Sequence, residues 1–115
     1  MKLLTSQQEK KLLANGLKMQ EVDISCNIQP VVKLFMPDGA GTWLLAWTDP
    51  CDRDIAWGLC DLGLGFPELG TVSLSELAEL RGALGLYVER DTYFKANKTL
   101  SEYADEAKKG RYLAA

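Results

Sequence analysis

Three segments in the middle of the chain have the apolar, β-branched and aromatic composition of β-strands. They are 31–36 (VVKLFM), 42–48 (TWLLAWT) and 55–62 (IAWGLCDL). Between them, 37–41 (PDGAG) predicts a turn and 49–54 (DPCDRD) a second turn or short loop, because proline fixes φ and glycine accepts positive φ. Strands joined by such short connections run antiparallel.

The segment 42–48 is apolar on both of its faces. Strict alternation points Trp43, Leu45 and Trp47 to one side of the sheet, and Leu44 and Ala46 to the other. A strand with two apolar faces is covered on both sides. We therefore expect this strand to be central in the sheet.

Capping patterns predict three helices, at about 6–15, 74–81 and 100–109. Their starts carry pairs that form capping boxes: Thr5 with Gln8 or Ser6 with Glu9, then Ser73 with Glu76, and Thr99 with Glu102. A glycine follows each helix, at Gly16 (after Asn15), Gly82 and Gly110. The second helix has an apolar stripe of Leu74, Leu77, Ala78 and Leu80, and the third has one of Leu100, Tyr103, Ala104 and Ala107.

The remaining segments complete one α+β domain over residues 1–115. The glycine-rich segment 63–70 (GLGFPELG) predicts a loop, 71–73 a short strand, and 85–94 (GLYVERDTYF) another strand. The predicted fold is an antiparallel sheet of four to five strands with an N-terminal helix, a helix at about 74–81 and a C-terminal helix. No apolar run reaches the roughly 20 residues that span a bilayer, and the start lacks a signal-peptide pattern, so we expect no membrane and a cytoplasmic location.

The charge distribution does not favour nucleic acid as a partner. The net charge is −3, and the acidic excess lies in residues 31–70. A nucleic-acid-binding protein usually concentrates basic residues on one face, although folding could still gather Arg81, Arg90, Lys95 and Lys98.

Several catalytic chemistries are excluded by the residue types present. The chain contains no histidine, which removes histidine-dependent triads and histidine metal sites. Its three cysteines, Cys26, Cys51 and Cys60, lack zinc-site spacing and predict a reduced protein with Cys60 in the core and Cys51 exposed. We expect no cofactor.

One acidic group could still serve catalysis. The carboxylates of Asp49, Asp52, Asp54 and Asp61 could hold Mg²⁺ or Ca²⁺. Their spacing fails the calcium-loop pattern, and aspartates also occur in solvated turns, where they bind the local backbone. The failed spacing favours the solvated turn and predicts no metal, with a site of these four aspartates as the alternative.

The three tryptophans are the other candidate site, since indoles serve as stacking platforms and as interface anchors. We expect Trp43 and Trp57 to lie in the core and Trp47 to be exposed beside the acidic turn. The candidate partner-binding surface is therefore Trp47, Asp49, Asp52, Arg53 and Asp54.

Two longer segments resemble a known family. The residues VVKLFMPDGAGTW, followed by DP and a glycine in the third strand, and then ELGTVSLSELAELRGALGLYVERDTYF, resemble a family of small bacterial proteins described only as a domain of unknown function. The resemblance covers about residues 30–94 and implies an association with plasmids, integrative elements and phage-related regions. It implies no reaction or cofactor. Trp47 stands where the resemblance leads us to expect an acidic residue, which weakens a metal-enzyme interpretation.

These observations favour a non-enzymatic protein that binds another protein, as an accessory or counter-defence factor of a mobile genetic element. An acidic surface of this kind can steer a protein towards a basic groove on its partner. One alternative is a small metal-dependent nuclease or hydrolase that uses the aspartate group. Another is a single-stranded nucleic-acid binder that uses the indoles and the later basic residues.

Overall fold

The computed structural model describes residues 3–21 and 28–115. Within them the chain forms α1 (Ser6–Glu21), β1 (Val32–Phe35), β2 (Thr42–Asp49), β3 (Asp52–Asp61), β4 (Glu68–Ser73), α2 (Leu74–Glu79), β5 (Glu89–Arg90) and α3 (Leu100–Gly110). The strands form one antiparallel sheet in the order β4-β3-β2-β1-β5. This confirms the α+β prediction.

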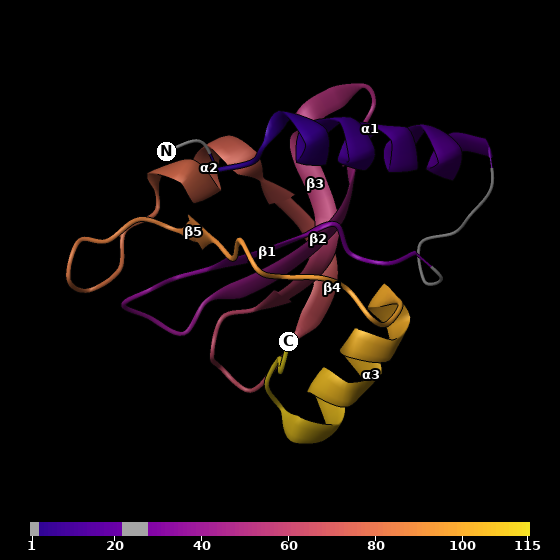
Figure 1. The fold of residues 1–115 in the computed structure, drawn as a ribbon. Coiled ribbons are helices and arrows are strands. Elements are labelled where there is room, and N and C mark those ends of the chain that lie inside the picture. The colour runs from indigo at the N-terminus through magenta and orange to yellow at the C-terminus, as the bar shows by residue number, and fades with distance from the viewer. Residues whose placement is uncertain (1–2, 22–27) are drawn as a thin grey trace.

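Two hydrophobic clusters hold the helices on opposite faces of the sheet (Figure 1). On one face Leu12 of α1 and Leu77 of α2 pack against sheet residues that include Leu45. On the other face α3 packs over Leu44 and Leu59. The sheet is therefore a middle layer that is covered by helices on both sides.

The central strand confirms the expected burial but not the expected alternation. Leu44, Leu45 and Ala46 have no exposed surface. The pairing with β3 shifts between Leu45 and Trp47, which leaves Ala46 as the extra residue of a β-bulge. Trp47 consequently belongs to the α3 face and Trp43 to the α1 face, so the prediction that they share a face is wrong.

The first helix continues past the residues that were expected to end it. The Thr5–Gln8 capping box forms as predicted, with Gln8 N donating to Thr5 Oγ1 at 3.1 Å. The helix then runs to Glu21, because Asn15 is buried and donates from Nδ2 to Ala46 O at 2.9 Å. These residues form the contact between α1 and β2 rather than a helix stop.

Several strand boundaries also differ from the prediction. Asp52 already pairs with Asp49, so β3 includes residues that were predicted as loop. Similarly, β4 begins at Glu68 because 68–70 pair with 58–60 of β3. The predicted strand at 85–94 shrinks to the two residues of β5 because Asp91 Oδ1 accepts a bond from Tyr93 N, which begins a turn.

The two later helices differ in how well they match their predicted stripes. The apolar stripe of α3 is buried as predicted, and its Thr99–Glu102 capping box is complete, although Arg111, not Gly110, provides the left-handed C-cap. The second helix ends at Glu79, and only part of its predicted apolar stripe is buried. Leu77 is buried, whereas Ala78 and Leu80 are exposed.

Candidate functional site

The aspartates of the predicted binding surface serve mainly as local hydrogen-bond acceptors. Asp49 Oδ1 accepts from Cys51 N at 2.8 Å, and Asp52 Oδ1 accepts from Asp54 N at 3.1 Å. Both contacts are typical of aspartates in tight turns. Cys51 is an exposed free thiol, as predicted.

Asp54 reaches further and binds the start of α2. Its carboxylate accepts bonds from Ser73 Oγ at 2.6 Å, Ser75 N at 2.9 Å and Ser75 Oγ at 3.1 Å. The bond from the Ser73 hydroxyl is the largest cause that lowers the pKa of Asp54, followed by the bond from the Ser75 backbone. Asp54 therefore holds the N-terminus of α2 onto β3.

The indoles do not form one platform. Trp43 is 3% exposed in the core under α1 and α2, as predicted. Trp47 and Trp57 are both half-buried on the α3 face, where their rings stack with centroids 5.6 Å apart. The predicted contrast between an exposed Trp47 and a core Trp57 is therefore wrong, because the bulge places Trp47 opposite Trp57.

The sheet also separates Trp47 from Arg53. Arg53 lines a shallow cavity of about 270 Å³ with Leu4 and Thr48, on the side of α1. The residues predicted to bind a partner thus do not share one face. Binding by this group stays a prediction.

Asp61 is a structural residue at the other end of β3. It is buried, and its two oxygens accept bonds from Gly63 N at 2.8 Å and Leu113 N at 2.7 Å. In the part of the chain that the structure describes, no group of three or more histidine, cysteine or acidic residues could hold a metal ion. The four aspartates proposed as ligands are therefore not brought together.

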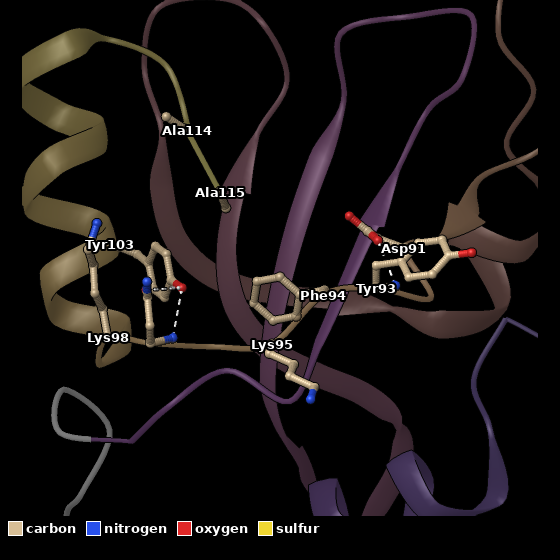
Figure 2. Close-up of a pocket in the computed structure, with 9 residues that line it drawn as sticks. Asp91, Tyr93, Phe94, Lys95, Lys98, Tyr103, Ala114 and Ala115 are labelled. Carbon is tan, nitrogen blue, oxygen red and sulfur yellow. Dashed lines mark hydrogen bonds between the residues drawn. The ribbon is translucent and has the colours of Figure 1, made fainter.

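In a small pocket beside α3, most of the polar side chains already bind other groups of the protein (Figure 2). It has a volume of about 380 Å³ and is lined by Asp91, Tyr93, Phe94, Lys95, Asn97, Lys98, Tyr103, Ala114 and Ala115. Tyr103 Oη donates to Asn97 Oδ1 at 3.0 Å, and Lys98 binds Glu106 at 2.6 Å. These contacts stabilise the start of α3 and direct the polar groups towards each other.

Three loops gather at one end of the sheet and form a surface that we call the loop end. They are the β1–β2 turn (36–41), the β3–β4 loop (62–67) and the segment 82–86 before β5. In Figure 1 the purple turn 36–41 and the orange segment 82–86 project together to the left. The β3–β4 loop meets the turn so closely that a Cβ on Gly63 would lie 2.4 Å from the Cβ of Ala40.

Asp38 fastens the turn to the segment 82–86. Its Oδ2 accepts bonds from Leu84 N at 2.7 Å and Leu86 N at 3.2 Å. A Cβ on Gly82 would overlap Asp38 Oδ1, so a larger residue would displace this carboxylate from its present position. The segments 37–39 (PDG) and 81–86 (RGALGL) therefore contact each other through Asp38.

The loop end exposes large apolar side chains. Leu84 is 81% exposed, Leu64 74% and Phe66 73%. Leu62 and Leu86 are also exposed. Asp38 is the one charged residue in the three loops, although a quarter of the whole chain is charged. Beside the segment 82–86, the Arg81 guanidinium lies over the Tyr87 ring at 4.8 Å.

Sequence reasoning missed this surface although part of the signal was present. The segments LGLGFP and GALGL are apolar, glycine-rich and without charge, which is unusual for loops of a charged protein. The first is predicted as a loop because a glycine-rich stretch is typical of turns, whereas the second falls between the predicted helix stop at Gly82 and the predicted strand 85–94. Their meeting at one end follows from the strand order, which the sequence does not display.

Comparison with known proteins identifies the family. Residues 3–113 match the family described as "Protein of unknown function (DUF2958)", and the chain belongs to that family. No curated protein and no solved structure gives a match. Across the described residues, the helices are too short or too polar to cross a membrane.

Proposed function

We propose that this member of a family of unknown function is a protein-binding module that contacts its partner through the loop end. The observation that carries the proposal is the exposure of Leu64, Phe66 and Leu84 on loops that have almost no charge. Contiguous exposed apolar surface on a soluble protein usually marks an interaction site. Such residues are the kind that become desolvated anchors when a partner covers them.

The construction of the loops supports the proposal. The two bonds to Asp38, together with the bond from Gly82 N to Leu86 O at 2.9 Å, fix the segment that presents Leu84. A surface that is ordered before binding loses less conformational entropy when the partner docks. The segment 82–86 of the loop end is thus both apolar and preorganised.

The test compares capture of proteins from a bacterial lysate by the immobilised wild type and by Leu64→Ser/Phe66→Ser. We expect capture of the partner to fall at least about tenfold, since loss of interface anchors costs about 2 kcal/mol or more. Leu17→Ser is the matched control, because Leu17 is an exposed leucine on α1, away from the three loops.

Thermal unfolding must show that the double variant is folded, which its exposed positions favour. Equal capture by wild type and double variant would contradict the proposal. Sedimentation of the wild type, but not the double variant, with phospholipid vesicles would instead assign the loop end to a membrane surface.

Two finer expectations accompany the proposal. One is an accessory or counter-defence role on a plasmid, integrative element or phage-related region, and the other is a cytoplasmic location. The first is supported only by the sequence resemblance, and the identity of the captured partner tests it. A host defence or DNA-processing protein would support it, and a metabolic enzyme would contradict it.

A further inference from the structure

The edge strand β4 begins where the β3–β4 loop ends and is paired on one side only. It pairs with β3 from Glu68 to Ser73, and within the described residues no other strand lies beside it. An edge strand exposes backbone N–H and C=O groups that another extended chain can pair with. Proteins commonly protect such edges with charged residues or proline. In β4 (ELGTVS) the only charged residue is Glu68, and the one neighbouring proline, Pro67, precedes the strand, so 69–73 carry no such protection.

Gly70 lies in the middle of β4, where neither the backbone conformation nor the surrounding atoms of this chain require a glycine. It does not have a positive φ, and a Cβ built on it would meet no atom within 4 Å. Its partner across the ladder is different, because a Cβ on Gly58 would lie 1.9 Å from Leu44 O. A glycine inside a strand weakens it and often marks close approach of another backbone or a ligand.

A groove runs along this edge on the α2 side, and a second groove lies beside the first residues of β4 on the α3 side. On the α2 side a groove of about 620 Å³ is lined by residues that include Trp43, Leu62, Gly70, Val72 and Leu80. On the α3 side a groove of about 610 Å³ is lined by Phe66, Pro67, Leu69 and others. Successive side chains of a strand point to opposite faces. A strand added to β4 would therefore place the side chains of one face along the α2-side groove, and those of the other face in the α3-side groove where it borders Glu68 and Leu69.

The two grooves carry opposite charges. Glu68 and Glu76 line the α2-side groove, and Lys108 and Arg111 line the α3-side groove. Glu68 also borders the second groove, but it pairs with Cys60, which packs in the cluster on the α2 side of the sheet. A segment with a basic residue on one face and an acidic residue on the other would match this arrangement.

We infer that β4 binds an extended segment of the partner protein as an added β-strand, with apolar side chains in both grooves and its backbone close to Gly70. Alternate residues of this segment face the two grooves. Those towards Glu68 and Glu76 include a basic residue, and those towards Lys108 and Arg111 include an acidic one. This inference rests on the proposed function, because the apolar β3–β4 loop leads directly into the edge and Leu62 lines the groove on the α2 side.

The test begins with a displayed library of random twelve-residue peptides, selected on the immobilised wild-type protein. The selected peptide is synthesised with a fluorescent label, and its Kd is measured by anisotropy for the wild type, Gly70→Ala and Gly70→Trp. We expect Gly70→Ala to bind several-fold more weakly than wild type, since a Cβ obstructs the close approach of the added backbone, and Gly70→Trp to bind at least about tenfold more weakly, since the indole fills the groove.

Hydrogen exchange provides a readout that needs no variant. The bound peptide should slow exchange of amides in 68–73, because newly paired backbone N–H groups are protected. Unchanged exchange in β4, equal binding to Gly70→Trp, or a library that yields no binding peptide would overturn the inference. Protection of the β4 amides in a dimer without peptide would also overturn it, because the edge strand would then pair with a second copy of the chain.

The lysate experiment separates the two proposals. If Leu64→Ser/Phe66→Ser loses the partner and Gly70→Trp keeps it, the loop end is the binding site and the added strand is wrong. If both variants keep the partner, the proposed function fails together with this inference. Loss of the partner by both variants supports both.

Discussion

Asp38 shows how one side chain determines the shape of the candidate surface. Its carboxylate joins the β1–β2 turn to a segment more than forty residues later, through Leu84 N and Leu86 N. The proline and glycine around Asp38 predict the turn correctly, but they do not predict the partner of the carboxylate. That partner depends on β5 lying beside β1, which is a property of the whole sheet.

We expect Asp38→Ala to destabilise the protein by about 1–3 kcal/mol, because two backbone N–H groups lose a charged acceptor. Urea unfolding measures the change. Asp52→Ala is the matched control, since Asp52 accepts one local bond in an exposed turn, and its effect should stay within about 0.5 kcal/mol. Equal midpoints for Asp38→Ala and wild type would show that the two bonds do not stabilise the segment.

Asp54 predicts a dependence of stability on pH. Bonds from the Ser73 hydroxyl and the Ser75 backbone lower its pKa in the folded protein. A carboxyl group with a lowered folded pKa stabilises the fold above its unfolded pKa, and this contribution is lost as the pH falls through the folded pKa. Asp54→Asn should therefore be less stable than wild type at neutral pH.

The difference between Asp54→Asn and wild type should shrink as the pH is lowered below about 4, the region of an unfolded aspartate pKa. Thermal unfolding from neutral to acidic pH gives the measurement. A constant difference across the whole range would show that the charge of Asp54 does not contribute to binding the α2 terminus.

Secondary-structure elements were predictable where their signals are local. The capping box and buried stripe of α3 lie within eleven residues, and both were predicted. The end of α1 was not, because Asn15 and Gly16 meet β2, about thirty residues further along the chain. The bulge at Ala46 similarly depends on β3, and it reversed the direction of Trp47.

The α1–β2 contact gives a prediction in which two identical substitutions have opposite effects. Gly→Ala inside a helix usually stabilises by about 0.5–1 kcal/mol. A Cβ on Gly16 would lie 1.9 Å from Thr48 O, so Gly16→Ala should instead destabilise by about 1–3 kcal/mol, as overpacking does. Gly70→Ala, which meets no atom within 4 Å, should be neutral or stabilising by up to about 1 kcal/mol.

Denaturant unfolding of both alanine variants tests this pair. A stabilised Gly16→Ala protein would mean that α1 can move away from β2 at little cost. A strongly destabilised Gly70→Ala protein would mean that the edge strand uses this glycine for folding, which would remove one argument for an added strand.

At the scale of the whole molecule, the two ends of the sheet differ in chemistry. The β2–β3 turn carries Asp49 and Asp52 at one end, and the three loops, in which Asp38 is the only charged residue, lie at the other, next to Thr42 and Asp61. Composition predicts a functional site at the acidic end, because carboxylates can bind metal ions and can steer a charged partner. The apolar end became visible only when the strand order placed three separate loops together.

This difference leads to a prediction about salt. Contacts made by the loop end itself should be nearly independent of ionic strength, because the only charge in the three loops is already bound within them. Contacts to Glu68, Glu76, Lys108 and Arg111 beside β4 should weaken as salt screens them. Binding steered by Asp49, Asp52 and Asp54 would weaken as salt screens the charges, since the screening length falls to about 3 Å at 1 M.

The measurement is the association rate and Kd of the captured partner by a surface-binding assay, from low to high sodium chloride. We expect binding to persist at high sodium chloride, with any loss of affinity due to the charged side chains beside β4, and ammonium sulfate to strengthen binding because it favours burial of apolar surface. Asp49→Asn/Asp52→Asn should match wild type throughout. A steep loss of association rate with salt, removed by these two substitutions, would instead place the binding surface at the acidic turn.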